Sequence, residues 1–309
     1  MSHLDLRQNP LGDEGIKIFS KALPKSNSLI HLDIRSTALT KEGIQYLYKG
    51  LLLNQTVTCL LLGNVRGMYK NYIAGDAMCG IDEYLKKSMQ LNFLDLNGAH
   101  IGDNGLPYLL SGLLKSQSLC ILNLSSNNLT GLSSANLVDI ITKTHVTKLD
   151  LSYNSLGTAF IDEFYGNTLY YKYPLTALSL SSCGFSNLKL GKLFQALRRG
   201  AYLRQLEINN TKYKITELIH LRSYLSNATT LRSFSSSNCE FGDEGAIHIA
   251  EAYIKDWTLN ELNLSNNLIT DRGAIIFANN LALTETFNLK SLDLSHNRIE
   301  VFFIKKLVG

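Results

Sequence analysis

Two nearly identical segments, HLDLR at residues 3–7 and HLDIR at residues 31–35, repeat side chains that bind metals or carry charge. They lie 28 residues apart, since 31 − 3 = 28. If they form neighbouring parallel strands, equivalent side chains stack about 4.8 Å apart. The stacked pairs are then His3 with His31, Asp5 with Asp33 and Arg7 with Arg35. The imidazoles and carboxylates could hold a metal ion, but we favour a solvated ladder of alternating charge and predict neither metal nor cofactor.

No other pattern in the sequence is typical of catalysis. The motifs of serine hydrolases, zinc proteases, P-loops and dinucleotide sites are missing, and the seven histidines are spread along the chain. The five cysteines form no CxxC pair. We interpret Cys183 and Cys239 as buried packing residues rather than reactive thiols. We therefore predict that the protein is not an enzyme.

Composition limits the partners and the compartment. Thirty Lys and Arg against 26 Asp and Glu give a net charge of only +4, and no basic cluster of the kind that binds nucleic acid is evident. No apolar run reaches the roughly 18 residues of a membrane span, and residues 1–10 do not resemble a signal peptide. An odd number of scattered cysteines is typical of a reducing compartment. We expect a cytoplasmic protein with no nucleic-acid and no membrane partner.

The positions of the leucines show a repeat that covers the whole chain. The pattern LxxLxLxxNxL recurs at spacings of 27 to 34 residues. The eleven units begin at Met1, Leu29, Val57, Leu91, Leu119, Val146, Leu175, Leu203, Leu231, Leu259 and Leu289. Because nothing is left over for a second domain, we predict that residues 1–309 form a single domain.

Each unit has two halves with different periodicities. The first half, such as LCILNLSSNNL at 119–129, alternates apolar and polar residues as a strand does. The second, such as GDEGIKIFSKAL at 12–23, spaces its apolar residues as a helix does. Asp13, Asp243 and Asp271 stand where these helices would start, at or just inside the N-cap. The sequence predicts an α/β protein with one strand and one helix in each repeat.

The segments LNLSSNNLT, LDLSYNSLG, LNLSNNLITDRGA and LDLSHNRIE resemble the ribonuclease-inhibitor type of leucine-rich repeat. The resemblance covers the full chain. It implies a solenoid, or horseshoe, of about eleven repeats with a parallel sheet on the concave side and helices on the convex side. Relatives include a ribonuclease inhibitor, immune-receptor sensor regions, Ran GTPase activators and bacterial effectors. Fold alone does not choose among these functions.

The fifth position of each unit should point out of the concave face. Six of its eleven residues are acidic and none is basic, so this column predicts a negative groove and a partner with a basic surface. The column reads Asp5, Asp33, Leu61, Asp95, Asn123, Asp150, Ser179, Glu207, Ser235, Asn263 and Asp293. The alternative is that these are ordinary residues of the repeat.

The unit that begins at Val57 is 34 residues long (91 − 57), six more than the usual 28. Its helical half matches the other units, so the extra residues should lie between Val65 and Tyr72, directly after the strand. We assign Val65 to the ninth position, where the other units have Asn, Thr, Cys or Ala. The extra segment is basic and aromatic and would lie beside Leu61, which should form an apolar patch. Such a loop is typical of a protein contact, with a neutral surface loop as the alternative.

One relative suggests a sharper alternative for the same loop. Ran GTPase activators are similar in carrying a lengthened early repeat with an arginine after its strand. Arg66 in NVRGMYK occupies the matching place. The resemblance implies that Arg66 could stabilise charge on a phosphate or dock a GTPase. Regulation of a small GTPase is therefore the alternative to a binding module.

We predict that a protein partner contacts the concave face and this loop. The residues are Asp5, Arg7, Asp33, Arg35, Leu61, Arg66, Tyr69, Lys70, Tyr72, Asp95, Asp150, Tyr153 and Glu207. A tyrosine-rich segment, FYGNTLYYKYP at 164–174, is a second candidate surface, of which some rings must pack between repeats. We also expect Trp257 to pack between units, and residues 302–307 to form a final helix that caps the core. The first strand starts at residue 3, so its edge would be covered by further chain or by self-association.

Overall fold

The computed structural model describes residues 1–185, 189–200, 202–253, 258–283 and 288–300. The chain divides into two compact units, Met1–Leu156 and Gly157–Gly309, which are treated separately below. Trp257 and the helix expected at 302–307 lie outside the described residues. The prediction of a single domain stays a prediction.

Each repeat contributes one short strand, which covers its third to fifth positions. In the first unit the strands pair in parallel and in chain order: β1 (His3–Asp5), β2 (His31–Asp33), β3 (Cys59–Leu61), β4 (Phe93–Asp95), β5 (Ile121–Asn123) and β6 (Lys148–Asp150). In the second unit the order is β7 (Ala177–Ser179), β8 (Gln205–Glu207), β9 (Ser233–Ser235), β10 (Glu261–Asn263) and β11 (Ser291–Asp293). Equivalent repeat positions pair throughout, as the sequence predicted.

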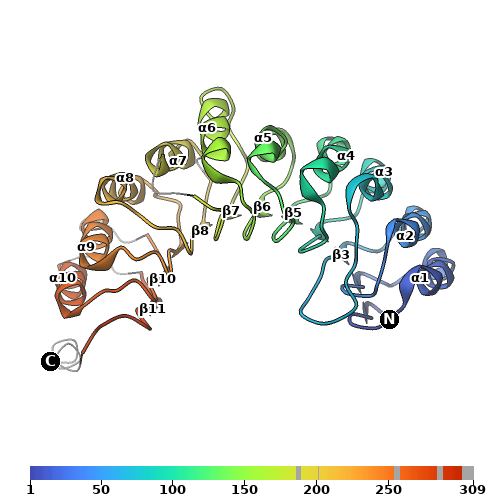
Figure 1. Cartoon of the computed structure of the whole chain (residues 1–309), viewed down its shortest axis with the longest axis horizontal. Coiled ribbons are helices and arrows are strands. Elements are labelled where there is room, and N and C mark those ends of the chain that lie inside the picture. Colours follow the sequence, from blue (N-terminus) through green and yellow to red (C-terminus); the bar gives the residue numbers. More distant parts are fainter. Residues whose placement is uncertain (186–188, 201, 254–257, 284–287, 301–309) are drawn as a thin grey trace. The chain divides into compact units, whose positions relative to one another are not determined.

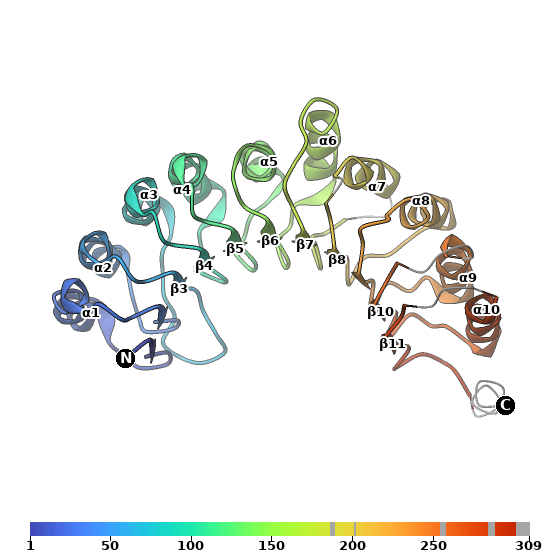
Figure 2. The ribbon, with the colours of Figure 1, turned by 180° about the vertical axis from the view of Figure 1, so that it is seen from behind.

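Helices alternate with the strands and lie on one side of them within each unit (Figures 1 and 2). Those of the first unit are α1 (Gly12–Ser20), α2 (Lys41–Leu53), α3 (Met78–Lys87), α4 (Gly102–Lys115) and α5 (Ser134–Lys143). Those of the second are α6 (Gly157–Asn167), α7 (Leu190–Arg198), α8 (Ile215–Leu225), α9 (Gly242–Ala252) and α10 (Asp271–Ala282). We call the side of the strands away from the helices the strand face. The predicted α/β repeat is confirmed.

The aspartates at the helix starts connect one repeat to the next. Asp13 and Asp243 are the second residues of α1 and α9, and Asp271 is the first residue of α10, as predicted. The carboxylate of Asp103 in α4 accepts hydrogen bonds from the backbone N–H of Thr130 (2.8 Å) and from its hydroxyl (2.6 Å). Asp13 bonds Thr40 and Asp243 bonds Thr270 in the same way. Each threonine also caps the next helical segment of its own repeat.

Leucines from the middle of the strands form the core beneath the helices. Leu32, Leu60, Leu94 and Leu122 are fully buried and stack on one another through the strand register. Burying one such side chain contributes about 2 kcal/mol. Cys183 and Cys239 are buried as well, which confirms their packing role. Within the described residues, no helix has both the length and the apolar character that a membrane span requires.

Candidate functional site

The insertion occupies residues 65–70, between the eighth and ninth positions of its repeat. The backbone N–H of Asn64 donates to the carbonyl of Asn97, just as Ser36 donates to Gly63 one repeat earlier, so Asn64 still follows the repeat. The N–H of Tyr72 donates to the carbonyl of Leu39 at 2.7 Å, as Ser155, at the tenth position of its repeat, donates to Leu129. Tyr72 is therefore an ordinary tenth-position residue.

Asn71 is the ninth-position residue, and our assignment of Val65 to that position is wrong. In a regular repeat, the side-chain oxygen of Asn154 accepts from the N–H groups of Asn127 and Leu129, both at 3.0 Å. The oxygen of Asn71 accepts equivalent bonds from Thr37 (2.9 Å) and Leu39 (3.0 Å). Both amide nitrogens donate to three backbone carbonyls, which for Asn71 are those of Ile34, Leu62 and Gly63. The insertion therefore leaves the asparagine ladder intact.

Two buried asparagines hold the base of the loop together. The N–H of Asn71 donates to the side-chain oxygen of Asn64 at 2.7 Å, and the amide of Asn64 donates to the carbonyl of Asn71 at 2.9 Å. We did not predict a role for either residue. The signal was present, because counting back from the helix places Asn71 at the ninth position.

The loop body is tied to the turns of the two preceding repeats, and it extends beyond the other turns of its unit (Figures 1 and 2). The amide of Gln8 donates to the carbonyl of Arg66 at 2.8 Å, and the N–H of Ala38 donates to Tyr69 at 3.1 Å. Lys70 turns back and donates its ammonium to the carbonyl of Val65. Gly67 has φ of +145°, a backbone conformation that other residues rarely adopt, so this position favours glycine. The loop therefore has a defined conformation.

The tip of the loop faces solvent despite this support. Met68 is 80% exposed, and Arg66 is also exposed. Among the described residues, the guanidinium of Arg66 has no carboxylate partner. Tyr69 and Lys70 are half-buried. Tyr72 stacks on His100, with ring centroids 4.6 Å apart and planes 7° apart, and still exposes its outer edge.

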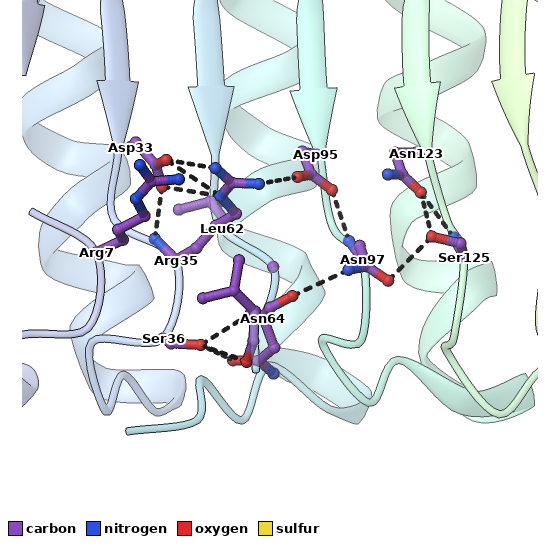
Figure 3. A network of polar contacts seen from close by, with 12 residues as sticks. Arg7, Asp33, Arg35, Ser36, Leu62, Asn64, Asp95, Asn97, Asn123 and Ser125 are labelled. Carbon is purple, nitrogen blue, oxygen red and sulfur yellow. Dashed lines mark hydrogen bonds and ion pairs between the residues drawn. The ribbon is translucent and has the colours of Figure 1, made fainter. Parts of the chain in front are cut away.

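On the strand face of the first unit, two arginines form ion pairs with aspartates of the fifth-position column (Figure 3). Arg35 Nη2 lies 2.6 Å from Asp33 on β2, and Arg35 Nη1 lies 3.5 Å from Asp95 on β4. Arg7 pairs with Asp5 at 3.0 Å. Three of the four acidic residues of this unit's column therefore pair with an arginine, and the two arginines offset two of the four negative charges. The predicted negative groove stays a prediction. Asp150 accepts from the N–H of Ser152 and has no cationic partner in the described chain.

Burial changes the proton affinities in this cluster. Burial raises the pKa of Asp95, although the backbone N–H of Asn97 and the charge of Arg35 act against it. The hydrogen bond to Asp33 raises the pKa of Arg35, so the guanidinium stays charged. The network continues through Asn97 to Ser125, whose hydroxyl donates to the Asn97 side chain at 3.0 Å (Figure 3).

Leu61 is only 6% exposed, so the predicted apolar patch beside the loop is wrong. The register places Leu61 on β3 between Asp33 and Asp95. Arg35 bonds both aspartates and therefore spans the strand on which Leu61 lies.

The histidine ladder forms as predicted, with His3 and His31 rings stacked 5.4 Å apart. Within the described chain, no three His, Cys, Asp or Glu side chains gather as metal ligands would. Tyr153 is exposed in the repeat of β6. In the second unit, Glu207 accepts from Gln205 (2.9 Å) and from Ser179 (3.2 Å).

The strand face of the second unit is edged by a neutral ladder rather than by ion pairs. Asn210 donates to Ser182, Asn238 to Asn210 and Asn266 to Asn238, at 2.6 to 2.8 Å. Each of these residues has a positive φ, which Asn tolerates better than most residues. This ladder satisfies its own polar groups and leaves no unmatched charge.

Six segments of the chain match the family model described as leucine-rich repeat: residues 1–19, 25–47, 87–109, 142–159, 258–278 and 287–301. The matched segments follow the strand-and-helix repeats seen in the structure. No curated protein matches the sequence. The finer assignment to the ribonuclease-inhibitor type stays a prediction.

Solved structures with the same fold come from distant proteins. An internalin (inlF) from Listeria monocytogenes is 15% identical over 99% of this chain and 84% of its own, with a TM-score of 0.51. LegL7, a leucine-rich-repeat protein from Legionella pneumophila, is 17% identical over 92% of this chain and 90% of its own, with a TM-score of 0.53. Mouse RP105, in complex with MD-1, is 18% identical over 99% of this chain and 48% of its own, about half its length, with a TM-score of 0.54. At these identities the likeness shows the fold alone.

Proposed function

We propose that this protein is a non-catalytic interaction module that binds a protein partner through the loop 65–70 and the adjoining strand face. One observation carries the proposal: an inserted loop with a fixed base presents an exposed tip. A loop that is already ordered loses little conformational freedom when it binds, which favours affinity. A loop kept only as slack would not need buried asparagines at its base and two anchors to neighbouring repeats.

The tip has suitable chemistry for a protein contact. Arginine and tyrosine are enriched at interface hot spots, and methionine adapts to irregular surfaces. Arg66 and Met68 supply the exposed contacts, with the half-buried Tyr69 beside them. We still expect the partner to have a basic surface, because no cation neutralises Asp150 or Glu207 in the described chain. A cytoplasmic location and a role as bacterial effector or immune-type sensor stay predictions.

Removing the loop tests the proposal directly. Deleting residues 65–70 joins Asn64 to Asn71 and restores the usual repeat length of 28 (34 − 6). We expect this variant to fold and to lose the partners that cross-linking recovers with the parent protein. Leu132→Ala is a matched control, because Leu132 is also a large exposed side chain of the first unit. An unchanged set of partners after loop deletion would refute the role of the loop.

Regulation of a small GTPase is a second candidate, and it depends on one observation. Arg66 is exposed on an ordered loop, and its guanidinium has no carboxylate partner in the described chain, as expected of a residue that contacts a phosphate. The test measures GTP hydrolysis by candidate small GTPases with the parent protein and with Arg66→Ala. Stimulation that Arg66→Ala abolishes supports this function, whereas no stimulation by the parent protein rules it out.

A further inference from the structure

Along the edge of the second unit where the helices end and the strands begin, the described turn residues carry exposed cations and no carboxylate, and exposed Glu261 follows them at the start of β10. Its described residues 168–176, 198–200, 202–204, 226–232, 258–260 and 288–290 contain no Asp or Glu, while Asp256 and Glu285 lie outside the described chain. We call the cations of this edge the basic rim: Lys172, Arg198, Arg204, Arg232 and Lys290. All five are exposed.

The opposite edge of the same unit shows that this is not a general feature of the surface. There Lys189 and Lys192 pair with Asp162, Lys212 lies 2.8 Å from Glu240, and Arg272 lies 3.1 Å from Glu244. On the basic rim, no ion pair holds Lys172, Arg198 or Arg204 in the described chain. Within the described chain, four cations of the opposite edge pair with carboxylates, with Lys214 as an exception, whereas these three cations of the basic rim do not.

Helix dipoles explain only part of the basic rim. A cation in the last turn of a helix is favoured by the dipole, which accounts for Arg198 at the end of α7. Arg204 and Arg232 come directly before β8 and β9, well past the helix ends. The N–H of Arg232 donates to the carbonyl of Arg204 at 2.8 Å, so the two stand side by side on neighbouring repeats. A row of this kind concentrates positive potential.

Exposed apolar side chains project beside these cations. Tyr170 is 82% exposed, and Leu169, Tyr171 and Tyr202 are also exposed. The turn after α6 that carries the first three projects beyond the end of α7 in both views (Figures 1 and 2). We call these four residues the apolar tip.

Two side chains fix that turn to the end of α7. Tyr173 is buried, and its hydroxyl donates to the carbonyls of Ala196 (3.2 Å) and Leu197 (3.0 Å). Arg199 donates to the carbonyl of Tyr165 at 3.2 Å and stacks on its ring at 4.8 Å. A Cβ at Gly200 would lie 2.2 Å from Tyr173, so glycine makes room for this anchor. The tyrosine-rich segment therefore divides into a buried anchor and an exposed tip, which agrees with our expectation that only some rings pack.

We propose that the basic rim and the apolar tip form a docking surface for an anionic lipid bilayer. Each cation near an anionic membrane surface strengthens binding by about fivefold. Interfacial tyrosines and a leucine add apolar contact at the depth of the headgroups. We predicted no membrane partner from the lack of an apolar segment, but a surface contact requires none. This proposal is independent of the protein-binding role of the loop.

Vesicle sedimentation with the full chain tests this surface. The probes are vesicles of phosphatidylcholine with phosphatidylserine and vesicles of phosphatidylcholine alone. We expect binding only to the first kind. The variant Lys172→Gln/Arg198→Gln/Arg204→Gln should weaken it by about fivefold for each cation removed, the equivalent of about 1 kcal/mol each. Tyr170→Ser/Tyr171→Ser should weaken it without changing the net charge.

The matched control is Lys212→Gln/Lys214→Gln/Arg272→Gln, which removes the same charge from the opposite edge. It should bind phosphatidylserine vesicles nearly as the parent does. Equal losses in the two triple variants would show a general charge effect and overturn the proposal. So would no binding by the parent, or rim-dependent binding to poly-glutamate or single-stranded RNA without binding to vesicles. Thermal unfolding of each variant checks that the fold survives.

Discussion

The side chains of Asn71 and Asn154 make equivalent sets of five backbone hydrogen bonds, although one follows a six-residue insertion and the other a regular turn. Asn71 differs in that its own backbone N–H and carbonyl also bond the side chain of Asn64 across the base of its loop. Beyond that base, the tip makes few contacts and is exposed. The repeat must keep the hydrogen bonds of its asparagine ladder, whereas the tip of the inserted loop is available to contact a partner.

The largest effect is expected from Asn71→Ala. It would leave the buried N–H groups of Thr37 and Leu39 without partners, at a cost of about 3 kcal/mol in the free energy of unfolding. Asn154→Ala should cost a similar amount, because its bonds are equivalent. Urea unfolding of both variants measures this. If Asn71→Ala lowered the free energy of unfolding no more than a surface substitution does, Asn71 would not be equivalent to Asn154.

A smaller effect is expected from Asn64→Ala, which opens the base but spares the ladder. We expect a loss of about 2 kcal/mol, because buried partners of the amide are left unsatisfied. The loop should also become easier to cleave. Trypsin, which cuts after Arg and Lys, should cleave after Arg66 and Lys70 faster in this variant than in Leu132→Ala. Equal rates in the two variants would show that Asn64 does not hold the loop closed.

The stability that Asp103 contributes between two regular repeats should depend on pH. The stability contributed by the asparagines at the base of the loop should not. Burial alone would raise the pKa of Asp103, but hydrogen bonds from Ser133 and Thr130 lower it below its usual value. A lowered carboxyl pKa contributes stability that is present above about pH 4 and is lost as the pH falls further. Asp103→Asn should therefore cost about 1 kcal/mol at neutral pH, since it weakens charge-assisted bonds.

The difference in the free energy of unfolding between the parent and Asp103→Asn should shrink as the solution is acidified from about pH 5 to about pH 3. Urea midpoints of the parent and Asp103→Asn at both ends of that range measure it. The loss in Asn71→Ala should be the same at both. A pH-independent loss in Asp103→Asn would contradict the assigned role of the carboxylate.

The smallest effect on stability is expected at the tip. Arg66→Ala/Met68→Ala removes exposed side chains and should change the free energy of unfolding by less than about 0.5 kcal/mol. Calorimetry or urea unfolding would show this. A large loss would mean that the tip is part of the folded framework and would remove its distinction from the base.

Repeat periodicity sufficed to predict the strands, their register and the helix starts, because each depends on local pattern and constant spacing. The assignment of Val65 failed because we counted forward from the strand through the insertion. Counting back from Met78 would have identified Asn71. The prediction that Leu61 forms an apolar patch failed for another reason. Arg35 bonds Asp95, sixty positions away (95 − 35), across the strand that lies between them. No local pattern contains that contact.

The partner affinity of tip variants tests the central claim most directly. Once cross-linking and purification have provided a partner, its dissociation constant is measured with the parent, Arg66→Ala/Met68→Ala and Leu132→Ala. We predict a loss of about tenfold or more for the tip variant, as expected of hot-spot residues, and no change for the control. Unchanged affinity of the tip variant, or an equal loss in the control, would contradict the assignment of the loop as the contact surface.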